Sequence, residues 1–287
     1  MMQNLTRDIT VIIPTYKTSN NNIDRFIQYR DFKVIILDQS NDLYLKNKIK
    51  NYLHSKLTYY AKDKNLGFGV ACNFLVSKVK TKYCLLTQAD VFINKKTIVS
   101  LKDSLTSNSN YIISAPMLTN SNKVFKNQKN NIKNVKQISV VKNVIAACFL
   151  VDVKKIKKIG FFDENFFLYW EDIDLCRRIK NTQYKIILNK ELFALHEGSK
   201  SSDNNLSMMY LRLSNYKYGE YLYDYKYHKL RIIKIIRQLF QKIIYFVGNI
   251  FIFKFKKAFF EMASLVGILK FFIFFFKDNI NFFFLRK

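Results

Sequence analysis

The chain has 287 residues, of which 49% are apolar and 24% charged, with 7 glycines and 2 prolines. This composition can bury a substantial core and excludes a disordered or fibrous protein. Lysine and arginine outnumber aspartate and glutamate 48 to 21, a net charge of +27. That excess favours polyanionic partners such as nucleotide diphosphates, anionic lipid or nucleic acid. The four cysteines lack CxxC spacing and sit among apolar residues, so we expect buried reduced thiols rather than disulfides or metal ligands.

Short β-branched runs alternate with helical patterns in the first hundred residues. No apolar run precedes the first of them, so we expect no signal peptide. Four buried strands are predicted: Ile9–Pro14, Lys33–Asp38, Leu57–Ala61 and Tyr83–Thr87. A helical pattern follows the third strand to about Val79, and another runs from Asn94 to about Ser107. This alternation indicates an α/β fold with a mostly parallel sheet and crossover helices.

Polar side chains follow the strand ends of this pattern. Tyr16, Asp38, Asn65 and Asp90 each come shortly after a predicted strand. In parallel sheets ligands bind beyond the carboxyl ends of the strands, so these residues point to one site.

The second half is less regular. In chain order it contains a strand at Tyr111–Ala115, a weakly patterned loop or ragged hairpin at 119–143, an apolar segment at Val144–Val151, a turn-like segment at Gly160–Asn165, a helix at Glu171–Lys180, a strand at Tyr184–Leu188, and a short strand ending at His196. No internal repeat is visible.

The composition changes near residue 226. From there on, 13 Lys or Arg residues face only two acids, and 15 of the 27 phenylalanines lie between Phe240 and Phe284. The longest uncharged apolar run, Ile243–Phe253, has 11 residues, whereas a spanning helix needs about 20. Basic residues interleaved with Phe and Ile are typical of interfacial helices. We therefore expect a catalytic domain at 1–225 and a membrane-associated amphipathic helical tail at 226–287, with a spanning hairpin within 240–284 as the alternative.

Two segments near the predicted site carry nucleotide-binding chemistry. Asp38 either hydrogen-bonds a pyrimidine base or caps a turn, because Gln39–Asp42 is turn-prone. The glycines of the segment Asn65–Gly69 let backbone approach a ligand, and the helix start that follows favours phosphate. An ordinary loop into a helix is the alternative for this segment.

Asp90 and His196 are candidate metal ligands. A carboxylate at a strand end can hold Mg²⁺ or Mn²⁺ against a diphosphate, because these ions prefer hard oxygen ligands. Asp90 can equally be a turn or N-cap residue. His196, one of three histidines, is either a metal ligand or a structural side chain.

Asp172 is the candidate general base. An apolar stripe lies three, four and seven residues after it: Leu175, Cys176 and Ile179. Asp172 is therefore predicted on the inward face, and Glu171, Asp174 and Arg178 on the outward side. An inward carboxylate is costly unless it is paired or used chemically, and burial raises its pKa as a general base requires. The alternative is a carboxylate that stabilises the helix N-terminus.

In order along the chain, these segments resemble the bacterial family-2 glycosyltransferases, particularly the rhamnosyltransferase-like branch. The resembling pieces are VIIPTY at Val11–Tyr16, ILDQS at Ile36–Ser40, NLGFGVACN at Asn65–Asn73, Asp90 within QADVFI, FFLYWEDIDLCRRI at Phe166–Ile179, and His196. They cover about residues 9–225, and the combination is far more specific than any single piece.

The resemblance implies a GT-A fold and an inverting transfer that needs Mg²⁺ or Mn²⁺. By this similarity Asp38 and Asn65 would contact the nucleotide base, and Asp172 would be the general base that deprotonates the acceptor. Asp90 would be the last acid of a DxD-type metal motif, and His196 would complete the metal site. Other residues implied at the donor are Pro14, Tyr16, Gly67, Gly69, Asn73 and Gln88; those implied on the acceptor side are Trp170 and Glu171. Gln88 departs from the family pattern, because an acid usually stands there.

The sequence thus predicts a transferase that uses dTDP-rhamnose or a UDP-sugar, extends a glycan or lipid-linked acceptor in cell-surface polysaccharide synthesis, and sits peripherally on the cytoplasmic face of the membrane. A non-catalytic sugar-nucleotide or glycan-binding relative, degenerate at Gln88, is the alternative. A nucleic-acid-binding protein is disfavoured, because basic and aromatic density peaks in a Phe-rich tail suited to lipid.

Overall fold

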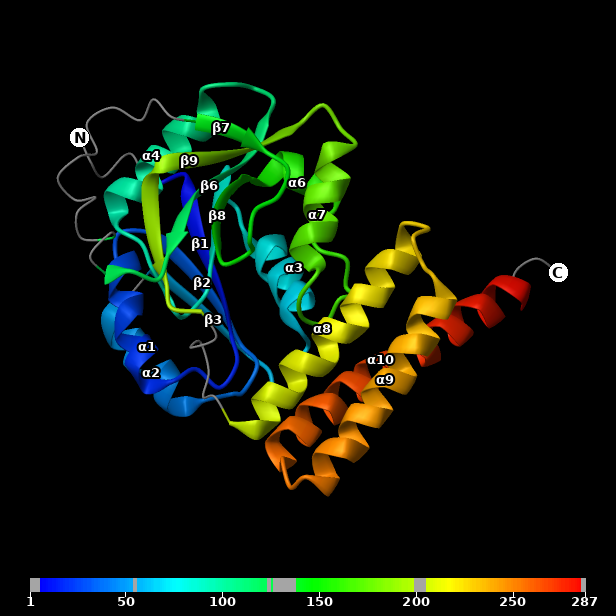
Figure 1. Ribbon diagram of the computed structural model, residues 1–287. Helices are drawn as coiled ribbons and strands as arrows, with labels where there is room; N and C mark the ends of the chain where they lie inside the picture. Colours follow the sequence, from blue (N-terminus) through cyan, green and yellow to red (C-terminus); the bar gives the residue numbers. More distant parts are fainter. Residues whose placement is uncertain (1–5, 54–55, 123–124, 126–137, 199–204, 285–287) are drawn as a thin grey trace. The chain divides into compact units, whose positions relative to one another are not determined.

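The computed structural model describes residues 6–53, 56–122, 125, 138–198 and 205–284 (Figure 1). The chain divides into two compact units. The sheet unit comprises Met1–Glu164 and Glu171–Asp203, and the helical unit comprises Asn165–Trp170 and Asn204–Lys287.

The first half of the sheet unit is parallel, as the sequence predicts. Its strands are β1 (Ile9–Thr15), β2 (Lys33–Asp38), β3 (Leu57–Ala61) and β4 (Tyr83–Thr87), in the order β3-β2-β1-β4. The runs are apolar almost throughout because both faces of a parallel sheet are covered by helices. The predicted bounds of β2, β3 and β4 are confirmed, and β1 extends one residue further.

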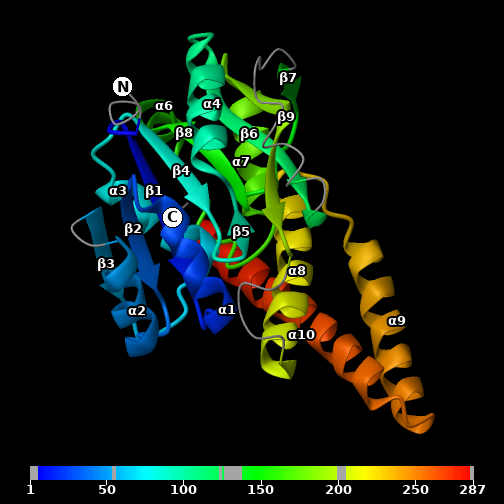
Figure 2. The ribbon, with the colours of Figure 1, turned by 90° about the vertical axis from the view of Figure 1, so that its left-hand side faces the viewer.

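Helices cover both faces of this sheet (Figure 2). They are α1 (Asn20–Ile23), the 3₁₀ helix η1 (Asp24–Tyr29), α2 (Leu43–Leu53), α3 (Phe68–Lys78) and α4 (Lys95–Thr106). One core cluster joins one side of the sheet to η1, α2 and α4, and a second joins the other side to α3. Asn94 starts α4 by accepting a hydrogen bond from the Thr97 backbone N–H at 2.8 Å.

The second half makes the sheet mixed. It contains β5 (Val91–Phe92), β6 (Tyr111–Thr119), β7 (Ile138–Val141), β8 (Cys148–Asp152) and β9 (Lys185–His196), with helices α6 (Val153–Ile159) and α7 (Glu171–Lys180) between β8 and β9. β8 is antiparallel to both β4 and β6, and β9 is parallel to β6 but antiparallel to β5 and β7. The described strands form one nine-stranded sheet.

Two sequence expectations for this half differ from the structure. The two strands expected after residue 183 are one strand, β9, whose register against β6 shifts between Pro116 and Met117. That irregularity absorbs the polar residues between Asn189 and Phe193 without ending the strand. The expected loop or hairpin at 119–143 ends in β7, and its residues 123–124 and 126–137 lie outside the described residues.

The helical unit contains α8 (Leu206–Lys226), α9 (Ile232–Phe251) and α10 (Phe255–Phe284). α10 packs against α8 closely enough that a Cβ added at Gly267 would lie 2.3 Å from the Ser214 carbonyl oxygen. Tyr221 and Leu222 of α8 join Phe271 of α10 in the core of this unit. The compact division falls before α8, at residue 204, because α8 buries its apolar side chains with α10. A functional boundary at 225/226 stays a prediction.

Among the described residues, one helix is long and apolar enough to cross a membrane when judged by length and composition alone, namely α10 over Phe255–Asn279. The sequence contains no uncharged run of that length, because Glu261 and Lys270 interrupt this segment.

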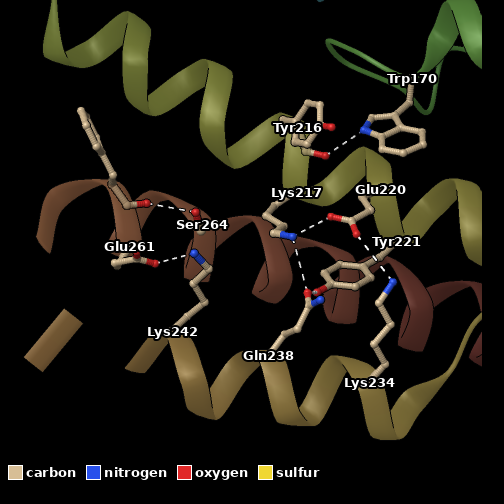
Figure 3. Close-up of polar contacts among 11 residues, drawn as sticks. Trp170, Tyr216, Lys217, Glu220, Tyr221, Lys234, Gln238, Lys242, Glu261 and Ser264 are labelled. Atoms are coloured by element: carbon tan, nitrogen blue, oxygen red, sulfur yellow. Dashed lines mark hydrogen bonds and ion pairs between the residues drawn. The ribbon is translucent and has the colours of Figure 1, made fainter. Parts of the chain in front are cut away.

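Trp170 is docked on α8 inside the helical unit. Its indole N–H donates to the Tyr216 carbonyl at 3.0 Å (Figure 3). The centre of its ring lies 5.4 Å from that of Tyr223. Tyr169 and Trp170 both have left-handed backbone, with φ of 68° and 73°. Such strain persists only where surrounding contacts fix it. Gly219 leaves the space, because a Cβ there would lie 2.7 Å from the Trp170 ring.

Gly219→Ala should therefore displace the indole and destabilise the helical unit by about 1–3 kcal/mol. Trp170 is the single tryptophan of the chain, so a shift in its emission spectrum reports the displacement directly. Gly248→Ala is the matched control, because nothing lies within 4 Å of a Cβ there; it should leave the emission unchanged and stabilise α9 by up to about 1 kcal/mol. Unchanged emission in Gly219→Ala would contradict the docking.

Candidate active site

The carboxylate at the end of β2 anchors the turn that follows it. Asp38 is fully buried, and Oδ1 accepts from the Ser40 backbone N–H at 3.0 Å and from Ser40 Oγ at 2.7 Å. Oδ2 accepts from the Asp42 backbone N–H at 2.6 Å and from the Tyr59 hydroxyl at 2.8 Å. Burial, and then Asp38, raises the pKa of Tyr59, which keeps the phenol a donor. These hydrogen bonds are the ones expected if Asp38 caps the turn. A contact between Asp38 and a pyrimidine base stays a prediction.

Gln39, which the sequence reasoning did not single out, ties this turn to the loop before α3. Its buried side-chain oxygen accepts from the Leu66 backbone N–H at 2.7 Å. Asn65 Oδ1 accepts from the Gly67 backbone N–H at 3.0 Å. Gly67 has φ 91°, a conformation that glycine alone adopts readily, and α3 begins at the next residue. Asp38 and Asn65 are thereby held at adjacent strand ends, with Gly69 buried in the first turn of α3.

Three other residues predicted at the donor lie in this unit with different surroundings. Pro14 is buried within β1, and Tyr16 is half-buried just after it. Asn73 faces the segment after α6: its amide donates to Phe162 O at 2.9 Å and accepts from Phe162 N at 3.0 Å. These contacts fix α3 against that segment, and a donor contact by Asn73 stays a prediction.

The segment after β4 brings Asp90 and His196 together. Val91 pairs with His196 across β5 and β9, which places His196 Nε2 3.6 Å from Asp90 Oδ2. The Asp90 carboxylate is buried, and its backbone carbonyl accepts from Arg25 Nη1 at 3.1 Å. Arg25 is held in turn by Glu197, at 2.8 Å.

The donor set of Asp90 and His196 fits a hard or borderline divalent cation, one oxygen and one imidazole nitrogen. Within the described part of the chain, no group of three or more His, Cys, Asp or Glu side chains gathers in a way that could hold a metal. Asp90 and His196 would supply two of the ligands that such an ion takes.

The backbone of Ala146 joins Gln88 to Asp172. Gln88 donates from Nε2 to Ala146 O at 3.2 Å, while Ala146 N donates to Asp172 Oδ2 at 3.2 Å. Gln88 also donates from its backbone N–H to Ala147 O at 3.2 Å. The carboxylate predicted as the base thus lies beside the end of β4, on the strand-end side that carries Asp90. The sequence reasoning missed Ala146 and Ala147, whose signal is two small residues just before β8.

The predicted phase of α7 is wrong for two of its acids. Leu175, Cys176 and Ile179 are buried as predicted, but so are Glu171 and Asp174. Asp174 is fully buried because Arg178 Nε lies 2.7 Å from it. The same guanidinium donates to the carbonyls of Ile159 at 3.2 Å, Gly160 at 2.6 Å and Phe161. A buried ion pair with its remaining donors satisfied can lie on an inward face.

Asp172 itself is half-buried. Besides Ala146, it accepts from the Ile173 backbone N–H at 2.8 Å. Burial raises the pKa of this carboxyl although these two hydrogen bonds lower it. A carboxylate with a raised pKa is a better proton acceptor, which is what the base in an acceptor deprotonation requires.

Glu171 is the most perturbed acid of the helix. The residue is 5% exposed, and its Oε2 makes no hydrogen bond. Burial, followed by the neighbouring Asp172, raises the pKa of Glu171 from 4.5 to about 8. The raised pKa favours the protonated form of Glu171 at neutral pH.

A parallel sheet that is continued by antiparallel strands and flanked by helices is the GT-A-type architecture. The sequence matches the Glycosyl transferase family 2 domain over residues 10–177. The chain belongs to glycosyltransferase family 2.

Relatives and solved structures agree with this fold. The chain is 21% identical over 218 residues to the low-salt glycan biosynthesis hexosyltransferase Agl10 of Haloferax volcanii, which covers 68% of this chain and 69% of that protein. It superposes on the mannosyltransferase PcManGT from Pyrobaculum calidifontis, in complex with GDP-Man and Mn²⁺, with TM-score 0.57 and 13% identity, covering 76% of this chain and 64% of the other. The match to S. aureus TarS 1-349 in complex with UDP-GlcNAc has TM-score 0.50 and 17% identity and covers 72% and 66%. The chain thus spans less than two thirds of either solved structure.

The raised pKa of Glu171 predicts a pH-dependent stability. The folded chain keeps this proton between about pH 4.5 and 8 while the unfolded chain loses it, so the contribution is fully present below pH 4.5 and is lost as pH rises through 8. Glu171→Gln mimics the protonated form and removes this dependence. The variant should become more stable than the parent with rising pH, by roughly 2–4 kcal/mol at alkaline pH. Urea unfolding at about pH 5, 7 and 9 measures the difference, and parallel pH profiles would show that Glu171 is not protonated in the fold.

Proposed function

We propose that this protein transfers a sugar from a nucleotide-diphosphate donor to a hydroxyl of a glycan or lipid-linked acceptor, in the synthesis of a cell-surface polysaccharide. The observation that carries the proposal is the Ala146 bridge, which holds Asp172 next to the strand end that bears Asp90. A base beside a diphosphate-binding edge is the arrangement that a direct displacement at an anomeric carbon requires.

The donor would lie at the carboxyl ends of β1, β2 and β4. The nucleotide base would contact the turns anchored by Asp38 and Asn65, and the diphosphate would lie near Asp90 and His196. A bound Mg²⁺ or Mn²⁺ supplies charge neutralisation for the departing nucleotide diphosphate. Support for a divalent ion comes from the donor set of this pair, and PcManGT was solved with Mn²⁺.

Asp172 would take the proton from the acceptor hydroxyl as that oxygen attacks the sugar from the face opposite the leaving group, which inverts the anomeric centre. Protonated Glu171 carries no charge and so does not compete for the proton. Trp170 and Glu171 precede the base directly and are proposed on the acceptor side. The donor is proposed as dTDP-rhamnose or a UDP-sugar, by the resemblance of FFLYWEDIDLCRRI to the rhamnosyltransferase-like branch.

We place this reaction at the cytoplasmic face of the membrane, with residues 226–287 on an anionic lipid surface. Support comes from the 13 basic residues against two acids in that segment, since basic residues near an anionic surface contribute about 1 kcal/mol each.

A non-catalytic binding protein remains the second candidate, favoured by Gln88 in place of the usual acid. Release of free nucleoside diphosphate in the presence of acceptor separates the two functions.

Asp172→Asn should lower kcat by about 10²- to 10⁴-fold, because the variant cannot accept the proton. Donor affinity and unfolding temperature should change little, since the amide is nearly isosteric. Asp103→Asn, the same change at an exposed position of α4, is the control and should keep full turnover. Asp174→Asn is not a suitable control, because it would break the buried ion pair with Arg178. Normal turnover in Asp172→Asn would exclude Asp172 as the base.

Asp90→Ala should abolish the stabilisation that Mn²⁺ adds to nucleotide binding, because it removes the buried oxygen ligand. The measurement is the shift in unfolding temperature with UDP or dTDP, with and without Mn²⁺. EDTA should reduce the parent to the behaviour of the variant. Turnover that survives EDTA unchanged would overturn the metal assignment of Asp90 and His196.

A further inference from the structure

Helix α9 turns three of its polar side chains toward the rest of the helical unit (Figure 3). Lys242 Nζ lies 2.6 Å from Glu261 Oε2 of α10. Gln238 Oε1 accepts from the Tyr221 hydroxyl of α8, and Lys234 Nζ lies 3.8 Å from Glu220 Oε1. These three residues recur every fourth position and so lie along one side of the helix. They form an inward polar seam.

The opposite side of α9 is apolar and exposed. Four of its side chains lie on one line, zero, seven, eleven and eighteen residues along from the first: Ile233, Phe240, Ile244 and Phe251. Their exposed fractions are 83%, 61%, 66% and 76%. The turn into α10 adds Phe253, which is 79% exposed. We call this set the outer face of α9.

This arrangement reverses that of a surface helix in water, which buries its apolar stripe and exposes its charges. Only Ile235 of α9 is buried among the described residues. An apolar face of this length is stable only against another apolar phase. Rotating α9 by half a turn would bury the apolar face, but it would also break the contacts of the seam with Glu261, Tyr221 and Glu220.

Charge selects what covers the outer face. Exposed cations stand beside it and at both of its ends: Arg231, Arg237, Lys254, Lys256 and Lys257. The two acids of residues 226–287 are held elsewhere, Glu261 by Lys242 and Asp278 by the Tyr225 hydroxyl at 2.8 Å. A second copy of the chain would bring like charges together, whereas anionic headgroups would neutralise them.

We propose that the outer face of α9 and the turn at Phe253 lie in the plane of an anionic bilayer, with α9 as an interfacial helix and α10 as the helix that holds it. α10 is the more apolar helix, but its small residues are used against α8: Gly267 packs on Ser214, and Ala263 is fully buried. This inference rests on the proposed membrane location and makes it specific, since it assigns contact to α9 and not to a spanning α10.

Flotation of the full chain with vesicles of phosphatidylglycerol and phosphatidylcholine tests the proposal. Deletion of residues 226–287 is unsuitable, because it would remove α10, against which α8 packs. The variant is Ile244→Glu with Phe251→Glu, two changes on the outer face. The control is Leu43→Glu, an equally exposed apolar residue, 65% exposed, in the sheet unit. Parent and control should float with the vesicles, and the variant should bind at least about tenfold more weakly.

Other outcomes overturn the proposal. Equal flotation of variant and parent excludes the outer face. A parent dimer in light scattering that becomes a monomer in the variant, without vesicle binding in either, identifies a second copy as the occupant. Binding that survives alkaline carbonate extraction identifies a spanning helix. The stabilisation that UDP or dTDP with Mn²⁺ gives is measured on all three proteins. If the parent shows none, the proposed transferase function is contradicted. If only the variant shows none, the variant is misfolded, and Ile233→Ser with Phe240→Ser on the same face replaces it in the flotation test.

Discussion

The antiparallel pairing of β8 with β4 is the constraint on which the site depends. Thr87 lies opposite Cys148 at the end of this ladder, so the two residues before β8 are carried past the end of β4. Gln88 then meets the Ala147 carbonyl with its backbone and the Ala146 carbonyl with its side chain. The remaining Ala146 N–H points to Asp172. Residues some sixty and eighty positions from Gln88 are thus aligned by one strand pairing.

The three acids at the start of α7 show how burial can assign different roles to neighbouring carboxylates. Asp174 is neutralised by Arg178, whose other donors are used on the carbonyls before Phe162. Burial and the neighbouring Asp172 raise the pKa of Glu171 to about 8, which favours its protonated form. Asp172 receives two backbone N–H groups and stays half-exposed. Asp172 is the least buried of the three, so its proposed role as the base rests on its surroundings rather than on its position in the motif.

The parallel half of the fold could be predicted from sequence because each strand is a short apolar run with its own terminating residue. The mixed half could not, because a bulge such as the one at Pro116 and Met117 depends on a partner strand some seventy residues away. The phase of α7 failed for a related reason. A helical wheel places apolar residues inward and charged residues outward, so it predicts that Asp174 is exposed. It takes no account of Arg178, whose ion pair allows Asp174 to be buried. Asp90 and His196 were predicted as a pair by resemblance, whereas the bridging Ala146 carries no chemical side chain that a motif could reveal.

The C-terminal segment illustrates the same limit in a different way. Sequence composition shows that Phe, Ile and Lys are interleaved, but it does not show which side of a helix meets protein. In α9 the answer comes from partners on other helices: Glu220 and Tyr221 of α8 and Glu261 of α10 draw its polar side inward. A polar seam inside a helical unit costs little if every donor is matched, and it fixes the rotation of the helix more strictly than apolar packing would. The exposed line from Ile233 to Phe251 is then a consequence of the seam, and the proposed bilayer contact would give that line an apolar surrounding.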